Sequence, residues 1–186
     1  DEVGPVDFVF LTVKAHSLIE VVDKLAPLMG PNTAVVSAQN GIPWWYFFGH
    51  VGIWNGTQLK SVDPEGIISK YIEPERIIGC ILYLSTEIVK PGVIKFTEGD
   101  RLAIGELDGS NSERCKELSE AIKKTGLRCP IRGRIREDLW VKLLGNVAFN
   151  PISALTRSTL DIIISDNGSE DGSVDFIRKR FLLRLV

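Results

Sequence analysis

The chain has 186 residues, of which 44% are hydrophobic, so it can build one packed domain, or one domain and part of a second. Its 22 basic and 24 acidic residues give a formal net charge of -2, which provides no positive field for nucleic acid or anionic lipid. Because no apolar run approaches the roughly 20 residues that a membrane span requires, we expect a cytoplasmic protein with no nucleic-acid or membrane partner.

The first elements have the pattern of a βαβ unit. Residues 6–14 form a short apolar run rich in Val and Phe, which is typical of a strand buried on both faces of a parallel sheet. Residues 16–29 carry apolar side chains at helical spacing, and a second apolar run follows at 33–39. Ligands of such units gather beyond the carboxyl ends of the strands, and Lys14 and Asn40 both fall at those ends.

The middle of the chain predicts a mixture of loops, strands and helices. The aromatic segment 43–48 favours packing over ligand contact, and residues 64–72 predict a short helix. Between residues 77 and 107, strand-like runs alternate with Pro, Gly and Asp turns, which predicts antiparallel strands added to the sheet. A surface helix over 111–126 and a short strand over 127–131 should follow.

A purely helical pattern begins near residue 134, where the α/β alternation stops. We therefore expect an α/β fold: a partial Rossmann-like, doubly wound domain over residues 1–133, followed by the beginning of an all-helical domain over 134–186. Pro151 should end or kink the first helix of that second domain, and Asn150 would then cap a new one.

Lys142, Asn146 and Asn150 are spaced four residues apart in an otherwise apolar stretch, so they lie along one helix face. One interpretation is structural: the lysine reaches solvent, the first asparagine is a satisfied core amide, and the second is a cap. The other is a set facing a cleft, in which an ammonium donates a proton to a carbonyl oxygen and the amides bind a small polar substrate. Asn40 in a turn and Lys14 at a strand end leave the same choice open.

The remaining reactive residue types point to no other chemistry. Cys80, Cys115 and Cys129 are odd in number, far apart and without a CxxC pair, which disfavours a disulfide framework and a zinc site. We interpret them as reduced packing residues. His16 and His50 have no metalloprotease spacing, and no GxSxG motif of a serine hydrolase occurs.

Five segments in this order resemble the ketopantoate reductase family, the NADPH-dependent 2-dehydropantoate 2-reductases. They are "VDFVFLTVKA", "NTAVVSAQNGIP", "KPGVIKFTEG", "LAIGE" and "REDLWVKLLGNVAFNPISALT", and they cover roughly residues 5 to 160. The most specific is the WxKLxxNxxxNP pattern that begins at Trp140.

The resemblance implies a Rossmann domain and a helical domain with the substrate between them, and reduction of 2-dehydropantoate (ketopantoate) to pantoate in pantothenate and CoA biosynthesis, or of a close 2-keto acid. Lys142 matches the family's catalytic general acid, and Asn146 and Asn150 match its substrate-binding asparagines. Asn40 matches an asparagine near both nicotinamide and substrate, and Lys14 a cofactor-side lysine. NADPH is thus the expected cofactor and a small keto acid the expected substrate. A homo-oligomer would cover exposed aromatic surface and an open sheet edge.

The sequence also departs from the family. No GxGxxG phosphate-binding loop occurs, and residues 165–186 do not follow the family's helical domain. We therefore expect a chain truncated at both ends, and the alternative function is a catalytically inactive folded fragment that acts at most as an oligomerising module. Residues 177–186 could form a basic amphipathic helix at a membrane or partner, but a frayed or packed terminal segment is favoured.

Overall fold

The computed structural model describes residues 3–157, so the interpretations of residues 165–186 and 177–186 lie outside the described residues. The chain divides into two compact units, Asp1–Asp138 and Leu139–Val186, and each is described by itself. The first unit contains the sheet and the helices that cover it. Helix α3, Ile135–Thr156, begins in the first unit and continues in the second.

The first unit is built on a four-stranded sheet in the order β1-β2-β3-β4. Its strands are β1 Val6–Leu11, β2 Met29–Ser37, β3 Ile77–Lys90 and β4 Val93–Glu106. The first three are parallel, and β4 runs antiparallel to β3. This arrangement confirms the expected α/β class with antiparallel strands added to a parallel unit.

The connection from β1 to β2 differs from the predicted α-helix. It consists of two 3₁₀ helices, η1 Ala15–Glu20 and η2 Val22–Leu28. Val21 between them has φ -122°, which is not helical, and Pro27 lacks the N–H that a longer helix would use. The apolar side chains of this segment still pack in the core, because Leu18 and Val22 are almost fully buried.

A buried aspartate begins the short predicted helix after the aromatic loop. The loop leads through η3, Pro64–Gly66, into α1, Ile67–Tyr71, and η4, Pro74–Arg76, precedes β3. Asp63 is fully buried, and its carboxylate accepts hydrogen bonds from the backbone N–H of Ile68 at 2.8 Å and from the hydroxyl of Ser69 at 2.5 Å. These bonds satisfy donors at the start of α1.

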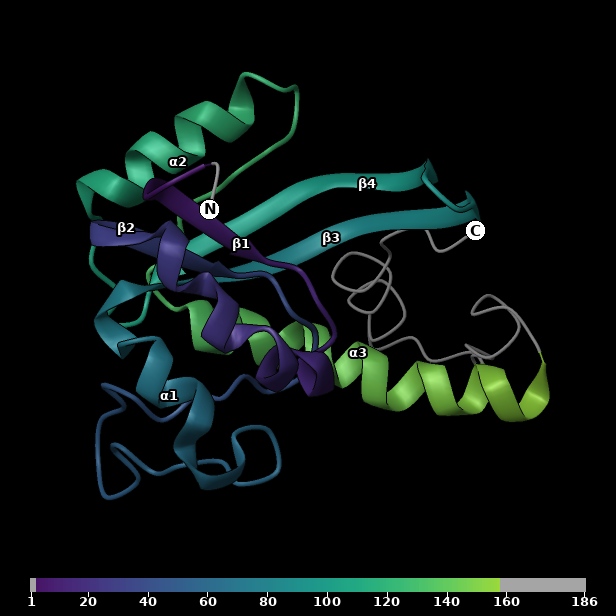
Figure 1. The fold of residues 1–186 in the computed structure, drawn as a ribbon. Coiled ribbons are helices and arrows are strands. Elements are labelled where there is room, and N and C mark those ends of the chain that lie inside the picture. Colours follow the sequence, from purple (N-terminus) through teal and green to yellow (C-terminus); the bar gives the residue numbers. More distant parts are fainter. Residues whose placement is uncertain (1–2, 158–186) are drawn as a thin grey trace. The chain divides into compact units, whose positions relative to one another are not determined.

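Strands β3 and β4 form one long hairpin of two 14-residue strands, whereas the sequence suggested more and shorter strands. The expected turn near Gly99 is instead a bulged position inside β4, with φ +88°. β2 pairs with β3 only as far as Gly79, so the hairpin continues well beyond the parallel strands, as Figure 1 shows.

Helix α2, Glu113–Lys123, covers one face of the sheet, and α1 lies on the other side (Figure 1). The Ser112 side chain caps α2 by accepting a bond from the backbone N–H of Cys115. The core beneath this helix includes Ala34, Val36, Ile78, Cys80, Leu102, Ile104, Cys115, Leu118 and Cys129. All three cysteines are free and buried, which confirms their packing role. The predicted strand over 127–131 is reduced to two isolated bridges, at Arg128 and Ile131.

Two glycines paired across the hairpin make room for the first turn of α3. Gly79 lies opposite Gly105, and a Cβ on either glycine would lie 3.0 to 3.3 Å from the side chain of Ile135. A Cβ on Gly105 would also lie 2.2 Å from the carbonyl oxygen of Arg132, a backbone atom that cannot swing aside.

We therefore expect Gly105→Ala to lower the free energy of unfolding by about 2–4 kcal/mol, because the backbone must shift to relieve this clash. Urea unfolding followed by circular dichroism measures the change. Gly133→Ala is the control: its Cβ would meet only the Gly109 carbonyl oxygen at 3.4 Å, so we expect a change within about 0.5 kcal/mol. Equal effects of the two substitutions would contradict the proposed cause.

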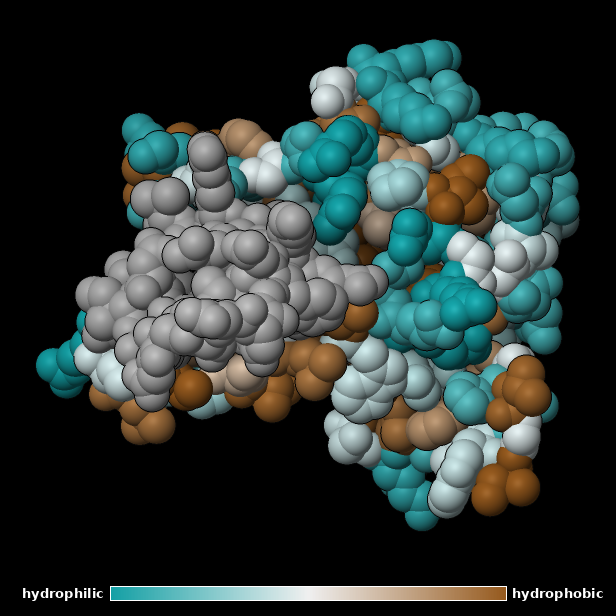
Figure 2. All heavy atoms as spheres, turned by 180° about the vertical axis from the view of Figure 1, so that it is seen from behind, coloured by the Kyte–Doolittle hydropathy of each residue, from teal (hydrophilic) through white to brown (hydrophobic). Residues whose placement is uncertain are grey.

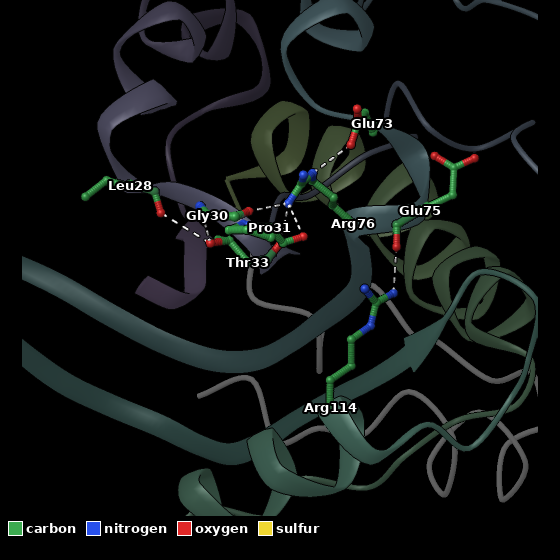
Figure 3. A network of polar contacts seen from close by, with 8 residues as sticks. All are labelled: Leu28, Gly30, Pro31, Thr33, Glu73, Glu75, Arg76 and Arg114. Carbon is green, nitrogen blue, oxygen red and sulfur yellow. Dashed lines mark hydrogen bonds and ion pairs between the residues drawn. The ribbon is translucent and has the colours of Figure 1, made fainter. Parts of the chain in front are cut away.

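The amino ends of the parallel strands are held by an arginine and a threonine (Figure 3). The Arg76 guanidinium donates to the carbonyl oxygen of Gly30 at 2.7 Å and to those of Pro31 and Thr33 at 3.3 Å. The Thr33 hydroxyl donates to the Val6 carbonyl oxygen at 2.5 Å. The first residues of β1 and β2 and the residue before β3 are thus joined at one edge of the sheet.

Glu106 at the end of β4 is a buried carboxylate with a full set of partners. Arg114 binds both of its oxygens, at 2.7 and 2.6 Å, and the Ser112 hydroxyl donates to it at 2.5 Å. Burial alone would raise the pKa of Glu106, but the hydrogen bonds from Arg114 and Ser112 and the charge of Arg114 lower it below its ordinary value of 4.5.

A lowered pKa in the folded state gives stability that is present above the unfolded pKa and is lost as the pH falls through the folded pKa. We therefore expect the urea midpoint to fall as the pH is lowered from 4.5, and Glu106→Gln to flatten that dependence. Glu117→Gln, which removes an exposed carboxylate of α2, is the control and should leave that dependence unchanged. The assignment is wrong if Glu106→Gln leaves the acid limb of the curve unchanged.

Candidate functional site

The carboxyl ends of β1 and β2 bring two of the predicted site residues to the same edge of the sheet. Lys14 follows β1 and precedes η1, and its carbonyl oxygen accepts a bond from the backbone N–H of Ser17 at 2.9 Å. Asn40 lies in the loop after β2, directly before Gly41, which has φ +92°. Both Lys14 and Asn40 are exposed. Parallel strand ends of this kind are where α/β sheets bind ligands.

A side chain that sequence reasoning missed joins these two loops. The Gln39 amide donates to the carbonyl oxygen of Val13 at 2.9 Å, and the backbone N–H of Ala38 donates to Leu11 at 3.1 Å. The residues next to Lys14 and Asn40 are therefore connected directly. The "QNG" motif contained the signal, because an amide beside the asparagine at a strand end can reach the neighbouring strand's loop.

The second unit carries the other three predicted residues on helix α3. Lys142, Asn146 and Asn150 lie four residues apart on it, so the structure places them along one helix face. Lys142 and Asn146 are half-buried, and Asn150 is exposed. The three side chains present one ammonium and two amides in a row.

Helix α3 does not end at Pro151, so the prediction of a second helix capped by Asn150 is wrong. Asn150 and Pro151 both lie inside the helix, which continues to Thr156. Two hydroxyls after the proline donate back to helix carbonyl groups: Ser153 to the Asn150 carbonyl oxygen at 3.0 Å, and Thr156 to that of Ile152 at 2.8 Å. Asn150 therefore belongs to the same face as Lys142.

Arg136, in the first turn of α3, is a second residue that the sequence did not reveal. Its guanidinium donates to the carbonyl oxygens of Tyr46, at 2.8 Å, and of Phe48 and Leu107. Burial lowers its pKa below the ordinary arginine value. A positive charge at a helix N-terminus interacts unfavourably with the helix dipole. An arginine in the first turn of the predicted helix therefore indicates that its guanidinium has a specific hydrogen-bond partner.

The aromatic segment that Arg136 holds packs in the interior. Trp44 and Trp45 are 2% exposed and Tyr46 is 9% exposed, so the packing interpretation of this segment is confirmed for these three residues. Tyr46 and Phe47 make an edge-to-face contact with ring centroids 4.9 Å apart. The segment following Asn40 is therefore anchored both by its rings and by its backbone carbonyl groups.

The residue types in the described part of the chain limit which ligands the site can bind. Within residues 3–157, no group of three or more His, Cys, Asp or Glu side chains could hold a metal ion. No helix in this range is both long and apolar enough to cross a membrane. The chemistry-bearing groups are ammonium and amide groups, which bind carbonyl, hydroxyl, carboxylate and phosphate oxygens.

Comparison with known proteins adds a family relationship to this geometry. The model of the family ketopantoate reductase PanE/ApbA matches residues 1–109. A 2-dehydropantoate 2-reductase of Mesorhizobium japonicum is 50% identical over 169 residues, which are 91% of this chain and 52% of that protein. A 2-dehydropantoate 2-reductase of Aquifex aeolicus is 28% identical over 80% of this chain and 42% of its own length. The chain thus spans about half the length of the curated relatives it matches.

A solved structure from Ralstonia solanacearum MolK2, provisionally named a ketopantoate reductase, gives the same picture for the fold. It superposes with a TM-score of 0.82 at 40% identity, over 88% of this chain and 51% of the other. A 2-dehydropantoate 2-reductase from Geobacter metallireducens GS-15 has a TM-score of 0.69 at 24% identity, over 89% of this chain and 48% of the other. These likenesses confirm the Rossmann-like fold class that the sequence predicts.

Proposed function

The chain belongs to the ketopantoate reductase PanE/ApbA family, and from this premise we propose that it supplies the carbonyl-reducing residues of an NADPH-dependent 2-dehydropantoate 2-reductase. The reaction would reduce the keto group of 2-dehydropantoate, or of a close 2-keto acid, to a hydroxyl group in pantothenate biosynthesis. We also assign residues 1–133 to the cofactor domain of this enzyme and residues 134–186 to its substrate domain.

The observation that carries this proposal is the ammonium and amide face of α3. We assign Lys142 as the proton donor: its ammonium would hydrogen-bond the keto oxygen, stabilise the negative charge that develops there, and then protonate it. Asn146 and Asn150 would hydrogen-bond the other polar groups of the substrate and fix its orientation. Half-burial of Lys142 and Asn146 supports this role, because hydrogen bonds strengthen where water is excluded.

The edge that carries Lys14 and Asn40 suits a nicotinamide cofactor. The Lys14 ammonium is a donor for phosphate oxygens, and the Asn40 amide offers both a donor and an acceptor for the nicotinamide amide and the substrate. NADPH would supply the hydride when bound, and the protein residues would orient and protonate the acceptor. The hydrogen bond from Gln39 to Val13 would hold the loops that carry Lys14 and Asn40 in a fixed relative position.

Calorimetric titration of the chain with NADPH, and turnover of 2-dehydropantoate followed by loss of NADPH absorbance, test the proposal. Saturable binding and turnover are the expected results. If the 186-residue chain is folded by circular dichroism but does not bind NADPH, a chimaera in which the Mesorhizobium japonicum relative supplies the rest of its length is tested next.

The alternative, a catalytically inactive fragment that acts as an oligomerising module, makes a different prediction. It requires both the chain and the chimaera to be folded and inactive. An active chimaera would reject that alternative for the residues of this chain, and a substrate panel would then distinguish 2-dehydropantoate from other branched or hydroxylated 2-keto acids. Self-association, as a homo-oligomer, is compatible with either function.

A further inference from the structure

A partly buried charge is more informative about ligands than the exposed apolar side chains of this protein. Hydrophobic residues reach the surface in several separate places on the face shown in Figure 2, and scattered exposed residues of this kind are normal. Burial of an ionic group, in contrast, costs free energy unless a partner compensates it. Arg101, on β4, is partly buried and lacks an ordinary partner.

Arg101 differs in this respect from the other partly buried arginines that the structure describes. Arg76 and Arg136 each donate to three backbone carbonyl oxygens. Arg114 binds both carboxylate oxygens of Glu106. Within the described part of the chain, Arg101 has no carboxylate at ion-pair distance, and its buried Nε has no hydrogen-bond partner. Buried polar atoms are usually paired, so this exception calls for a ligand.

Tyr83 holds the Arg101 guanidinium without neutralising it. The two residues lie opposite each other in the β3–β4 register, and the guanidinium carbon is 3.8 Å from the centroid of the tyrosine ring. Such stacking uses the flat face of the guanidinium and leaves N–H groups in its plane for an acceptor. Burial raises the pKa of Tyr83 above its ordinary value of 10.0, although Arg101 acts to lower it, so the hydroxyl carries no negative charge at neutral pH.

The aspartates that interact electrostatically with this pair already have other arginine partners. Asp100, next to Arg101 on β4, binds Arg128 through both oxygens, at 2.6 and 2.7 Å. Asp138, in the first turn of α3, binds Arg132 through both oxygens, at 2.7 and 3.0 Å. Three arginines thus stand against two aspartates, and the positive charge of Arg101 is the one left over.

The hairpin carries Arg101 and Tyr83 past the carboxyl ends of the parallel strands. Strand β2 ends at Ser37, which pairs with Gly79 of β3. Tyr83 is four residues further along β3, which is about 13 Å in an extended strand. Since β2 and β3 are parallel, this direction leads beyond the same strand ends that carry the predicted ligand residues, as the course of the hairpin in Figure 1 shows.

The strand register also determines which face of the hairpin carries the pair. Tyr83 and Gly79 share one face, because side chains alternate along a strand and the two residues are four apart. Gly79 is the glycine that makes room for Ile135 of α3, and Tyr83 interacts electrostatically with Asp138 of the same helix turn. The guanidinium therefore lies on the face that the first turn of α3 covers.

A carboxylate is the ligand that fits these observations. The N–H groups of a guanidinium form a planar fork that matches the two oxygens of a carboxylate, and charge-assisted bonds of this kind are strong. Every 2-keto acid carries a carboxylate on the carbon next to its keto group. The ammonium and amide groups proposed above for the keto oxygen and the other polar groups include no guanidinium for it.

We propose that Arg101 binds the carboxylate of the 2-keto acid substrate, and that Tyr83 positions the guanidinium for this contact. The identity of the substrate rests on the proposed reductase function. The contacts that define the site, in contrast, all lie within the first unit. Arg101 is then the residue that makes the protein prefer an acid over an uncharged analogue of the same shape.

Calorimetric titration of the 186-residue chain with 2-dehydropantoate, and with the corresponding uncharged carboxamide, tests the proposal. We expect the acid to bind more tightly than the carboxamide. Arg101→Met should weaken binding of the acid by roughly 10- to 100-fold, because charge-assisted hydrogen bonds are lost, and should change binding of the carboxamide less than about threefold. Arg134→Met, which removes an exposed arginine, is the matched control and should leave both affinities within about twofold.

Arg101→Lys separates the geometry of the fork from its charge. Lysine keeps a positive charge near the Tyr83 ring but offers a single ammonium, so the acid should bind several-fold more weakly than to the unaltered chain. Circular dichroism establishes that each variant is folded. If Arg101→Met does not fold, Arg101→Lys carries the test, because it must still reduce the preference for the acid over the carboxamide.

NADPH titration of the same variants distinguishes a substrate carboxylate from a cofactor phosphate. Arg101→Met should leave the affinity for NADPH within about twofold of that of the unaltered chain. If the substitution weakens NADPH and not the keto acid, the anion at Arg101 is a phosphate, and the proposal is overturned. If the folded chain does not bind the acid, the chimaera described above is titrated, and a folded chimaera that does not bind it overturns the proposal as well.

The outcomes separate this inference from the proposed function. Turnover of 2-dehydropantoate with an acid affinity that Arg101→Met does not change would reject the role of Arg101 and leave the reductase function in place. Selective loss of acid binding in Arg101→Met, without turnover by the chain or the chimaera, would support the carboxylate site and reject the reductase function. In an active form, Arg101→Met should raise KM for the acid more than it lowers kcat.

Discussion

Lys142→Ala is expected to lower kcat for the reduction of 2-dehydropantoate by roughly 10²–10⁴-fold, the usual contribution of a positioned general acid. The physical reason is that negative charge on the keto oxygen would lose both its stabilising ammonium and its proton source. Affinity for NADPH should change little, because Lys142 lies on α3 and not at the strand ends that carry Lys14 and Asn40. Steady-state kinetics and NADPH titration of the same sample separate these two quantities.

The measurement uses whichever active form the binding experiment identifies, the chain or the chimaera. Lys142→Arg should remain strongly impaired, because a guanidinium keeps the charge but is a very poor proton donor at neutral pH. Lys123→Ala, which removes an exposed lysine paired with Glu120 on α2, is the matched control and should retain full activity. A Lys142→Ala enzyme with undiminished kcat would show that another group protonates the substrate.

Arg136→Met is expected to destabilise the protein by about 2–4 kcal/mol, because three part-buried hydrogen bonds from a charged donor to backbone carbonyl groups are lost. Methionine preserves much of the side-chain volume but donates no hydrogen bond, so the carbonyl groups of Tyr46, Phe48 and Leu107 would lose their partner. Carbonyl groups that are partly shielded from water are costly to leave without a donor. The urea midpoint and the slope of the transition, followed by circular dichroism, give the change in unfolding free energy.

Arg134→Met is the control for this substitution. Arg134 is two residues earlier, its side chain is 79% exposed, and its ion pair with Glu137 is solvated. We expect an effect within about 0.5 kcal/mol, because exposed ion pairs contribute little. Similar losses for both variants would mean that positive charge near the start of α3, and not the three carbonyl contacts, determines the stability.

The sheet and α2 could be predicted from the sequence because their signals are local and strong. Apolar runs of strand length, a charged helix over residues 111–126, and the strand ends that carry Lys14 and Asn40 all follow from periodicity. The spacing of Lys142, Asn146 and Asn150 likewise predicts a shared helix face, which α3 contains. Their catalytic roles came only from the family resemblance and stay a prediction.

The remaining features depend on contacts that spacing does not encode. Apolar periodicity does not distinguish one α-helix from two 3₁₀ helices that break at Val21. The rule that proline ends a helix failed at Pro151, which lies inside α3. Gln39 and Arg136 act through partners elsewhere in the fold, and Arg136 binds carbonyl groups about 90 residues earlier in the chain. Tertiary structure decides such cases.

The Arg76 and Thr33 contacts have a consequence for how this protein can evolve. They join the strands at their amino ends, whereas Lys14 and Asn40 lie beyond the carboxyl ends. A mutation that changes the length or sequence of a loop beyond the carboxyl ends therefore leaves the Arg76 and Thr33 contacts intact. Natural variation can accumulate in the loops at that edge while selection preserves the opposite edge, so one scaffold can acquire new ligand preferences without first losing its ability to fold.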